Sequence, residues 1–384
     1  MTTAKPAVPG TLPPPSVPPP GVPPPDAPPL GRLHGFHPGW YGAVMGTAIV
    51  GIVAYQDPGQ LAGLGDLLRA FGVLMVALSA LLAVGLGVPY VARWLRHPDA
   101  ARADLANPVT GALYATFPAG ILVLAVGIAT VGPSVLSTDA STALIAILAV
   151  VGIAIAFAMS VIFAALLFTS HGVEPQAANG GWFIPPVVMI IVPMVLMPLV
   201  PWVATIDIPL LVFAGYASWG MGLLLFVLVA SLLYGRLVFH PLPAAPLAPS
   251  LWIGLGPIGV GSVALLGLAR AGGPVWGDAA AAVTALSSIG AALLWGFGVW
   301  WLAAALVLLG AYLRRGGLPY GLGWWAFTFP LGAFTASTIA LARTWQLGLL
   351  ESLGAILFVV LIVFWLIVAA GTLRAIRTGQ VWRR

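Results

Sequence analysis

The side chains that could support acid–base or metal chemistry are few in this sequence, and their spacing does not suit such chemistry. There is no cysteine, and the five histidines fall between apolar runs without an HxxxH spacing. A metal site built from them is one interpretation, and ordinary histidines of loops or of a membrane interface are the other. Only residues 93–104 are dense enough in charge to suggest an enzyme at a membrane face. The sequence therefore predicts no catalytic residue, no metal and no cofactor.

A short phrase recurs in the chain and carries a stronger signal. Residues 115–120 read A-T-F-P-A-G and residues 327–332 read F-T-F-P-L-G, with G-P-I-G at 256–259 as a weaker copy. Proline inside a helix removes a backbone donor and clashes with the preceding turn. A recurring broken helix is typical of transporters and channels built from internal repeats. The predicted helix kinks lie at Pro118, Pro193, Pro257 and Pro330.

A phenylalanine precedes the proline in both full copies of the phrase. An aromatic ring at a constriction can exclude water and close a pore. Phe329 and Phe117 are therefore the predicted pore gate. For each of them, packing against lipid or protein is the alternative interpretation.

The elements that must position these residues are membrane-spanning helices. Of the 384 residues, 60% are hydrophobic and 7% are charged, whereas about a quarter of the residues in a soluble domain are charged. Ten apolar runs, each about long enough to cross a bilayer, follow one another with short loops between them. Their approximate bounds are 39–55, 67–88, 108–131, 140–168, 182–204, 209–233, 250–269, 279–313, 320–341 and 347–373.

The odd-numbered and even-numbered runs differ in proline content. Interior prolines occur in the odd runs, with the glycine-rich first run as the exception, whereas the even runs are almost free of them. A broken helix is tolerated in lipid only where protein or a watery cavity covers it. We therefore predict an all-α polytopic membrane protein of five helical hairpins. Its kinked odd helices lie inside, around a central pore, and its straight even helices lie outside.

The interior of the odd runs contains no Asp, Glu, Lys, Arg or His. Proton-coupled carriers usually hold an ionisable relay at membrane depth, so its lack favours a channel-like path. Five helix N-termini at one mouth, each with about half a positive charge, and further N-termini at the breaks would attract anions. The residues expected to line this path are Thr47, Thr116, Thr328, Thr335, Ser262 and Gly256. A bond from each hydroxyl back to its own helix is the alternative.

The two ends of the chain complete the predicted organisation. Residues 1–38 hold fourteen prolines and cannot bury a core, so we expect a disordered cytoplasmic tail, or alternatively a docking segment for a proline-binding partner. The transport domain is expected at 39–373, and a short basic cytoplasmic tail at 374–384. With alternating spans, 12 of the 15 Lys and Arg residues lie on the side of both termini. That side should be cytoplasmic, in the plasma (inner) membrane.

Five phrases, one for each odd run, resemble the tellurite-resistance/C4-dicarboxylate transporter family. That family includes malate and sulfite transporters of yeast and the slow anion channels of plant guard cells. The phrases are HPGWYGAVMGT at 37–47, NPVTGALYATFPAG at 107–120, WFIPP at 182–186, APSLWIGLGP at 248–257 and WWAFTFPLG at 324–332. The resemblance implies a ten-helix bundle with quasi-fivefold symmetry, often a homotrimer. It also implies that a phenylalanine on the ninth helix, here Phe329, occludes the central pore.

The predicted function is channel-like transport of small anions, either a C4-dicarboxylate such as malate or an inorganic anion such as sulfite. A proton-coupled C4-dicarboxylate carrier is the alternative within the same class, and a membrane-embedded enzyme is the alternative of another class. The expected partners are the anion, the lipid bilayer and, in a homotrimer, further copies of the chain. Nucleic acid is not expected, because the basic residues lie in short loops between spans.

The charge distribution makes a prediction about topology. A reporter that is active only in the cytoplasm should be active when fused after Arg384 and silent when inserted at Asp139. A reporter that is active only outside should give the reverse. The opposite pattern for both reporters would invert the predicted orientation of every span.

Overall fold

The computed structural model describes residues 31–382, and these residues form helices and loops without a strand. Nine helical stretches in this part are long and apolar enough to cross a membrane. The tenth crossing segment is α1 (Tyr41–Tyr55), which has 15 residues and is buried at all positions except Gly42 and Tyr55. It is too short to match the bilayer by itself and is shielded from lipid by its neighbours. The predicted all-α fold with ten spans is confirmed.

The spans fall into two classes by burial. Apart from α1, the inner helices are α4 (Thr116–Val131), α6 (Ile184–Leu196), α8 (Leu255–Ala271) and α11 (Phe329–Trp345). The outer helices are α2 (Gly65–Arg96), α5 (Thr138–Thr169), α7 (Ile208–Phe239), α10 (Ala280–Arg314) and α12 (Gly348–Arg377). In their most apolar stretches, 72–89% of the residues of the four longer inner spans are buried, against 17–28% in the outer spans. The division predicted from proline parity is confirmed.

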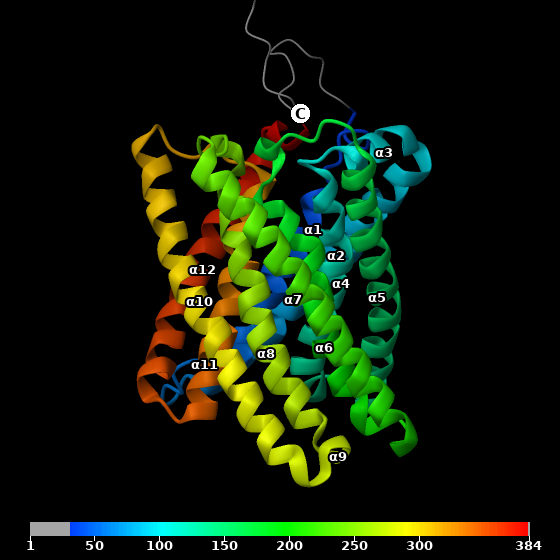
Figure 1. Cartoon of the computed structure of the whole chain (residues 1–384), viewed down its shortest axis with the longest axis vertical. Coiled ribbons are helices and arrows are strands. Elements are labelled where there is room, and N and C mark those ends of the chain that lie inside the picture. Colours follow the sequence, from blue (N-terminus) through cyan, green and yellow to red (C-terminus); the bar gives the residue numbers. More distant parts are fainter. Residues whose placement is uncertain (1–30, 383–384) are drawn as a thin grey trace, which may run out of the picture.

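The five inner helices form a closed ring, in which α1 packs against α4, α4 against α6, α6 against α8, α8 against α11, and α11 against α1. Each outer helix lies over the groove between two ring neighbours. Thus α2 covers α1 and α4, α5 covers α4 and α6, α7 covers α6 and α8, α10 covers α8 and α11, and α12 covers α11 and α1. Figure 1 shows the long helices running along a common axis.

Every inner helix begins with a 3-10 segment. These segments are η1 (Pro38–Trp40), η2 (Gly111–Ala115), η5 (Gly180–Phe183), η8 (Ala245–Gly254) and η10 (Leu322–Phe327), and they contact one another in the same cyclic order as the helices. The two ends of the described chain lie at this end of the bundle, together with α3 (Pro98–Ala106), and α9 (Gly273–Trp276) lies at the opposite end (Figure 1).

Three of the four prolines predicted to kink a helix lie instead at the start of an α-helix. Pro118, Pro257 and Pro330 lie in the first turn of α4, α8 and α11, and only Pro193 lies inside an α-helix. In a first turn the missing N–H has no intrahelical partner to lose, so proline fits there at little cost. The irregularity at three of the four positions is therefore a 3-10-to-α junction rather than a kink within a continuous helix.

The predicted proline-rich tail lies mostly outside the described residues, which begin at residue 31. Its last part belongs to the folded bundle, because Phe36 is buried and the carbonyl oxygen of Pro38 lies 3.0 Å from the hydroxyl of Thr116. Residues 383–384 of the predicted basic tail also lie outside the described part. The rest of that segment continues α12 to Arg377.

The ring packs tightly because glycine stands where its helices meet. A Cβ built on Gly259 of α8 would lie 2.4 Å from the carbonyl carbon of Ala333 in α11, whereas a Cβ on Gly267 of the same helix meets nothing within 4 Å. Small residues at such contacts let two backbones approach closely in a membrane.

This contrast predicts opposite effects of two Gly→Ala changes in one helix. Gly259→Ala should destabilise the protein by about 1–3 kcal/mol, because backbone atoms must move apart. Gly267→Ala should be neutral or stabilising by up to about 1 kcal/mol, because alanine restricts the unfolded chain more than glycine does. Thermal unfolding of the purified protein measures both. Equal Tm values for the two variants would contradict the close α8–α11 contact.

Candidate anion pathway

The predicted gate residue Phe329 is the first residue of α11 and follows Thr328, the single residue between η10 and α11. Its side chain is buried, with 5% of its surface exposed. A Cβ built on Gly256 of α8 would lie 3.7 Å from Phe329 Cε1 and 3.7 Å from Val187 Cγ2 of α6. Because α6 and α11 flank α8 in the ring, Gly256 and Phe329 lie side by side where these three helices meet.

The pair of Phe329 and Gly256 has the parts of a hydrophobic gate. Glycine presents only backbone at this point, so the phenyl ring has no competing side chain from α8. A bulky ring in a narrow apolar passage excludes water and with it a hydrated ion. Rotation about the side-chain torsions moves such a ring between staggered positions, which is the motion that a gate of this kind would use.

Phe117 has different surroundings, although its local sequence is nearly the same. Its ring is half-buried and stacks on Tyr90 of α2, with centroids 4.5 Å apart, and meets Tyr41 of α1 edge-on at 4.7 Å. The ring thus lies between inner helices and the outer helix α2. Phe329 has no aromatic partner of this kind among residues 31–382. Phe117 therefore packs against aromatic side chains, whereas Phe329 lies in the buried hydrophobic cluster of the inner helices.

The predicted hydroxyl groups are buried and bonded to backbone carbonyls. Thr328 donates to Trp325 O at 2.8 Å, and Thr335 donates to Leu331 O at 2.8 Å. Thr116 donates to Leu113 O at 2.7 Å. A hydroxyl whose proton is used in this way offers only lone pairs to a passing ion, so it cannot donate to an anion without breaking its own bond.

Two of the predicted path residues are turned toward outer helices. Thr47 accepts a hydrogen bond of 3.1 Å from the indole of Trp365 in α12. Ser262 lies 2.9 Å from Ile258 O in its own helix and 3.2 Å from Ala291 O in α10. These contacts do not support a place for Thr47 or Ser262 at the axis.

The electrostatics of the ring come from its backbone more than from its side chains. The only Asp, Glu, Lys, Arg or His residues in the five inner α-helices are Arg270 and Arg343, and both lie in a last turn. The five helices start at the same end of the bundle, so their positive N-terminal dipoles point to one mouth. A passage with a positive mouth, apolar walls and no carboxylate would attract an anion and hold it weakly, as conduction requires.

Residues 35–373 match the family described as voltage-dependent anion channel. The chain belongs to this family. The match covers all ten spans, and the resemblance noted from the five phrases is thereby confirmed together with membership of a transporter and channel family.

Three relatives in this family extend over nearly the whole chain. An uncharacterized transporter of Methanocaldococcus jannaschii is 32% identical over 349 residues, which are 91% of this chain and 95% of the relative. A sulfite efflux pump of Trichophyton rubrum is 28% identical, over 91% of this chain and 92% of its own length. A malic acid transport protein of Schizosaccharomyces pombe is 22% identical, over 90% and 79% respectively.

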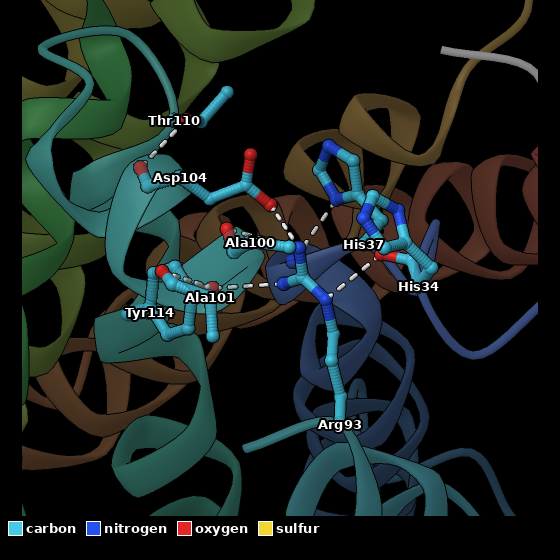
Figure 2. A network of polar contacts seen from close by, with 9 residues as sticks. His34, His37, Arg93, Ala100, Ala101, Asp104, Thr110 and Tyr114 are labelled. Carbon is cyan, nitrogen blue, oxygen red and sulfur yellow. Dashed lines mark hydrogen bonds and ion pairs between the residues drawn. The ribbon is translucent and has the colours of Figure 1, made fainter. Parts of the chain in front are cut away.

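In this member of the anion channel family, the charged residues 93–104 form a structural cluster at the mouth with the helix N-termini. Figure 2 shows the guanidinium of Arg93 among Asp104 of α3, Tyr114 of η2 and the segment that contains His34. Arg93 is buried and pairs with Asp104 at 2.5 Å, and it donates to Tyr114 Oη at 2.8 Å and to His34 O at 3.1 Å. Its donors are used within the protein, so the cluster ties four segments together.

A second charged cluster closes the opposite end of the ring. Arg343 of α11 pairs with Glu351 of α12 at 2.9 Å and donates to the carbonyls of Gln56 and Asp57 after α1. Glu351 also accepts from the backbone N–H of Gly59 at 3.0 Å. The sequence offers one signal for this contact, because Arg343 and Glu351 are isolated opposite charges on the same predicted side. It offers none for Gln56 and Asp57, which contribute backbone atoms.

Proposed function

We propose that this protein is a channel-like conductor of small anions whose path runs along the axis of the inner ring and is closed by Phe329. The observation that carries the proposal is the burial of the Phe329 ring beside Gly256, in a ring of helices whose interior lacks carboxylates. Anions are attracted to the mouth by five helix N-termini and pass the constriction when the aromatic ring turns aside. Phe117 is assigned to packing.

The proposed substrates are malate-like C4-dicarboxylates and sulfite. The relatives named as a sulfite efflux pump and as a malic acid transport protein support this class. Both kinds of anion are small, oxygen-rich and doubly charged when fully ionised, which suits a passage that acts through dipoles rather than through a shaped polar pocket.

The setting proposed for this activity is the plasma membrane, with both termini in the cytoplasm and the chain assembled as a homotrimer. The excess of Lys and Arg on the side of the termini supports the orientation. The trimer follows from the family resemblance and is checked by the mass of the purified complex.

Removal of the Phe329 ring tests the gate. Phe329→Ala should raise anion flux severalfold per folded molecule, because the constriction loses the group that excludes water. As a buried aromatic residue it also leaves a cavity, for which about 3–5 kcal/mol of stability is lost in a packed core. Flux of radiolabelled malate and sulfite into liposomes, normalised to folded protein, separates the two effects.

Phe117→Ala is the matched control, because it removes the same ring from the same local sequence. It should lower stability through the loss of contacts with Tyr41 and Tyr90, without a gain in flux. Wild-type flux in well-folded Phe329→Ala protein would remove the gate from the proposal, and a gain only at Phe117 would reassign it.

The mode of coupling is tested separately. Because the ring interior holds no titratable relay, flux should follow the anion gradient and the membrane potential and should not need a proton gradient. Uptake is measured in liposomes with the potential clamped and the pH gradient collapsed. Flux within about twofold of that with a pH gradient is expected, and its disappearance would replace the channel with the proton-coupled carrier.

A further inference from the structure

A deep apolar groove lies between the first and the last outer helices of the chain. It has a volume of about 570 Å³ and is lined by α2, α12 and the inner helix α1. Leu82 and Leu86 line it from α2, and Leu373 and Ile376 line it from α12. The last two side chains are exposed on the outer surface of the bundle, so the groove opens toward the bilayer.

The groove follows from the geometry of the ring. Outer helices pack over pairs of inner helices rather than against one another, so α2 and α12 stand on either side of α1, and the groove runs between them over the buried residues Ala43 and Thr47. A corresponding groove between α7 and α10 is much smaller, with a volume of about 130 Å³, and has no charged residue in its lining. The groove at α1 therefore differs from its counterpart in depth and in charge.

The apolar groove has one charged residue at its edge. Arg32 lines it there and is the only charged residue in the lining. Arg374 and Arg377 lie in the last turn of α12, next to the lining residues Leu373 and Ile376. No carboxylate lines the groove, so its mouth favours a negatively charged group at the level of the membrane surface.

The tryptophans of the groove differ in their hydrogen bonds. The indole of Trp325 donates to Thr372 Oγ1 at 3.1 Å, and that of Trp365 donates to Thr47 Oγ1 at 3.1 Å. Trp40 is 4% exposed, and its Nε1 has no hydrogen-bond partner within the described residues. It stands near Arg32 in sequence and packs 6.2 Å from the ring of Trp382, at the charged end. An indole N–H left without an acceptor at this depth is costly.

We propose that this groove is a binding site for one anionic phospholipid, with an acyl chain between α2 and α12 and the phosphate group at Arg32. An apolar cavity that is open to hydrocarbon fills with hydrocarbon rather than with water. An oxygen atom of the lipid head would supply the acceptor that the N–H of Trp40 lacks. The bound lipid would join the first and the last hairpin of the ring on the side of the chain termini.

Other occupants fit less well. The proline-rich segment ends at the mouth of the groove, where the described residues begin, but each of its residues would bring a backbone carbonyl into a cavity that offers a single unpaired donor. Unsatisfied carbonyls are expensive in contact with lipid. A second copy of the chain would have to insert a ridge of side chains, and the charged rim of Arg32, Arg374 and Arg377 would then face an identical rim if the contact were twofold symmetric.

The test is lipid binding to the purified full-length protein after delipidation, by native mass spectrometry with phosphatidylglycerol and phosphatidylcholine as probes. The wild type should retain one phosphatidylglycerol more tightly than phosphatidylcholine. Arg32→Gln should reduce that preference by about tenfold, the loss expected for one charge-assisted hydrogen bond. Ala369→Phe, which fills the groove from α12, should abolish retention of both lipids.

Ala304→Phe is the matched control, because it fills the smaller groove between α7 and α10 in the same way. It should leave lipid retention unchanged, and the thermal unfolding of each variant shows whether it is folded. Equal retention by wild type and folded Ala369→Phe would overturn the proposal. Stronger retention after deletion of residues 1–30 would assign the groove to the tail, and a change of oligomeric mass in Ala369→Phe without any bound lipid would assign it to a second copy.

Discussion

The constraint on which the structure depends is that no backbone polar group can be left unpaired in contact with lipid. Five inner segments have 3-10 starts, and four of the inner helices have a proline in the first turn, so they lack the regularity that a lone membrane helix needs. They are possible because five regular outer helices cover the grooves between them. The irregular inner helices therefore require the regular outer helices that cover them. This arrangement places the irregular backbone inside the bundle and the regular apolar helices toward the lipid.

The same constraint explains how an anion path can exist without charged walls. A basic residue at the axis would bind an anion strongly and slow its release, whereas helix dipoles act from a distance and are shared among five helices. Hydroxyl groups of the inner helices donate to backbone carbonyls of their own segments. The positive potential therefore comes from the backbone dipoles and not from these side chains. In the proposed function, the group that closes the path is a steric one, the ring of Phe329 beside Gly256. Attraction and closure are thus assigned to different parts of the structure.

The sequence predicted the ten spans, the parity of inner and outer helices and the family, because hydropathy and proline placement are strong signals in a membrane protein. It could not predict which way an inner side chain faces. These helices are apolar all round, so their periodicity carries no direction, and Thr47, Ser262 and Phe117 point toward outer helices. The sequence predicts kinks at the first-turn prolines, because the composition of an apolar run does not show where a 3-10 segment ends and the α-helix begins. The clusters around Arg93 and Arg343 join residues distant in sequence and rely on backbone carbonyls, which have no sequence signature.

The short helix α1 has a consequence for the order in which the protein is made. It is synthesised before the other spans. Gly42 and Gly46 of α1, however, pack against Trp325 and Thr328, which belong to the ninth span. The Arg343–Glu351 contact that fixes the end of α1 also comes from the last hairpin. During synthesis, α1 can pack only against α2 and α4 at first. Its remaining side stays in contact with lipid until α11 and α12 have been synthesised. Ring closure is therefore the final step of biogenesis, and a chain that stops before it retains four complete hairpins without a sealed axis.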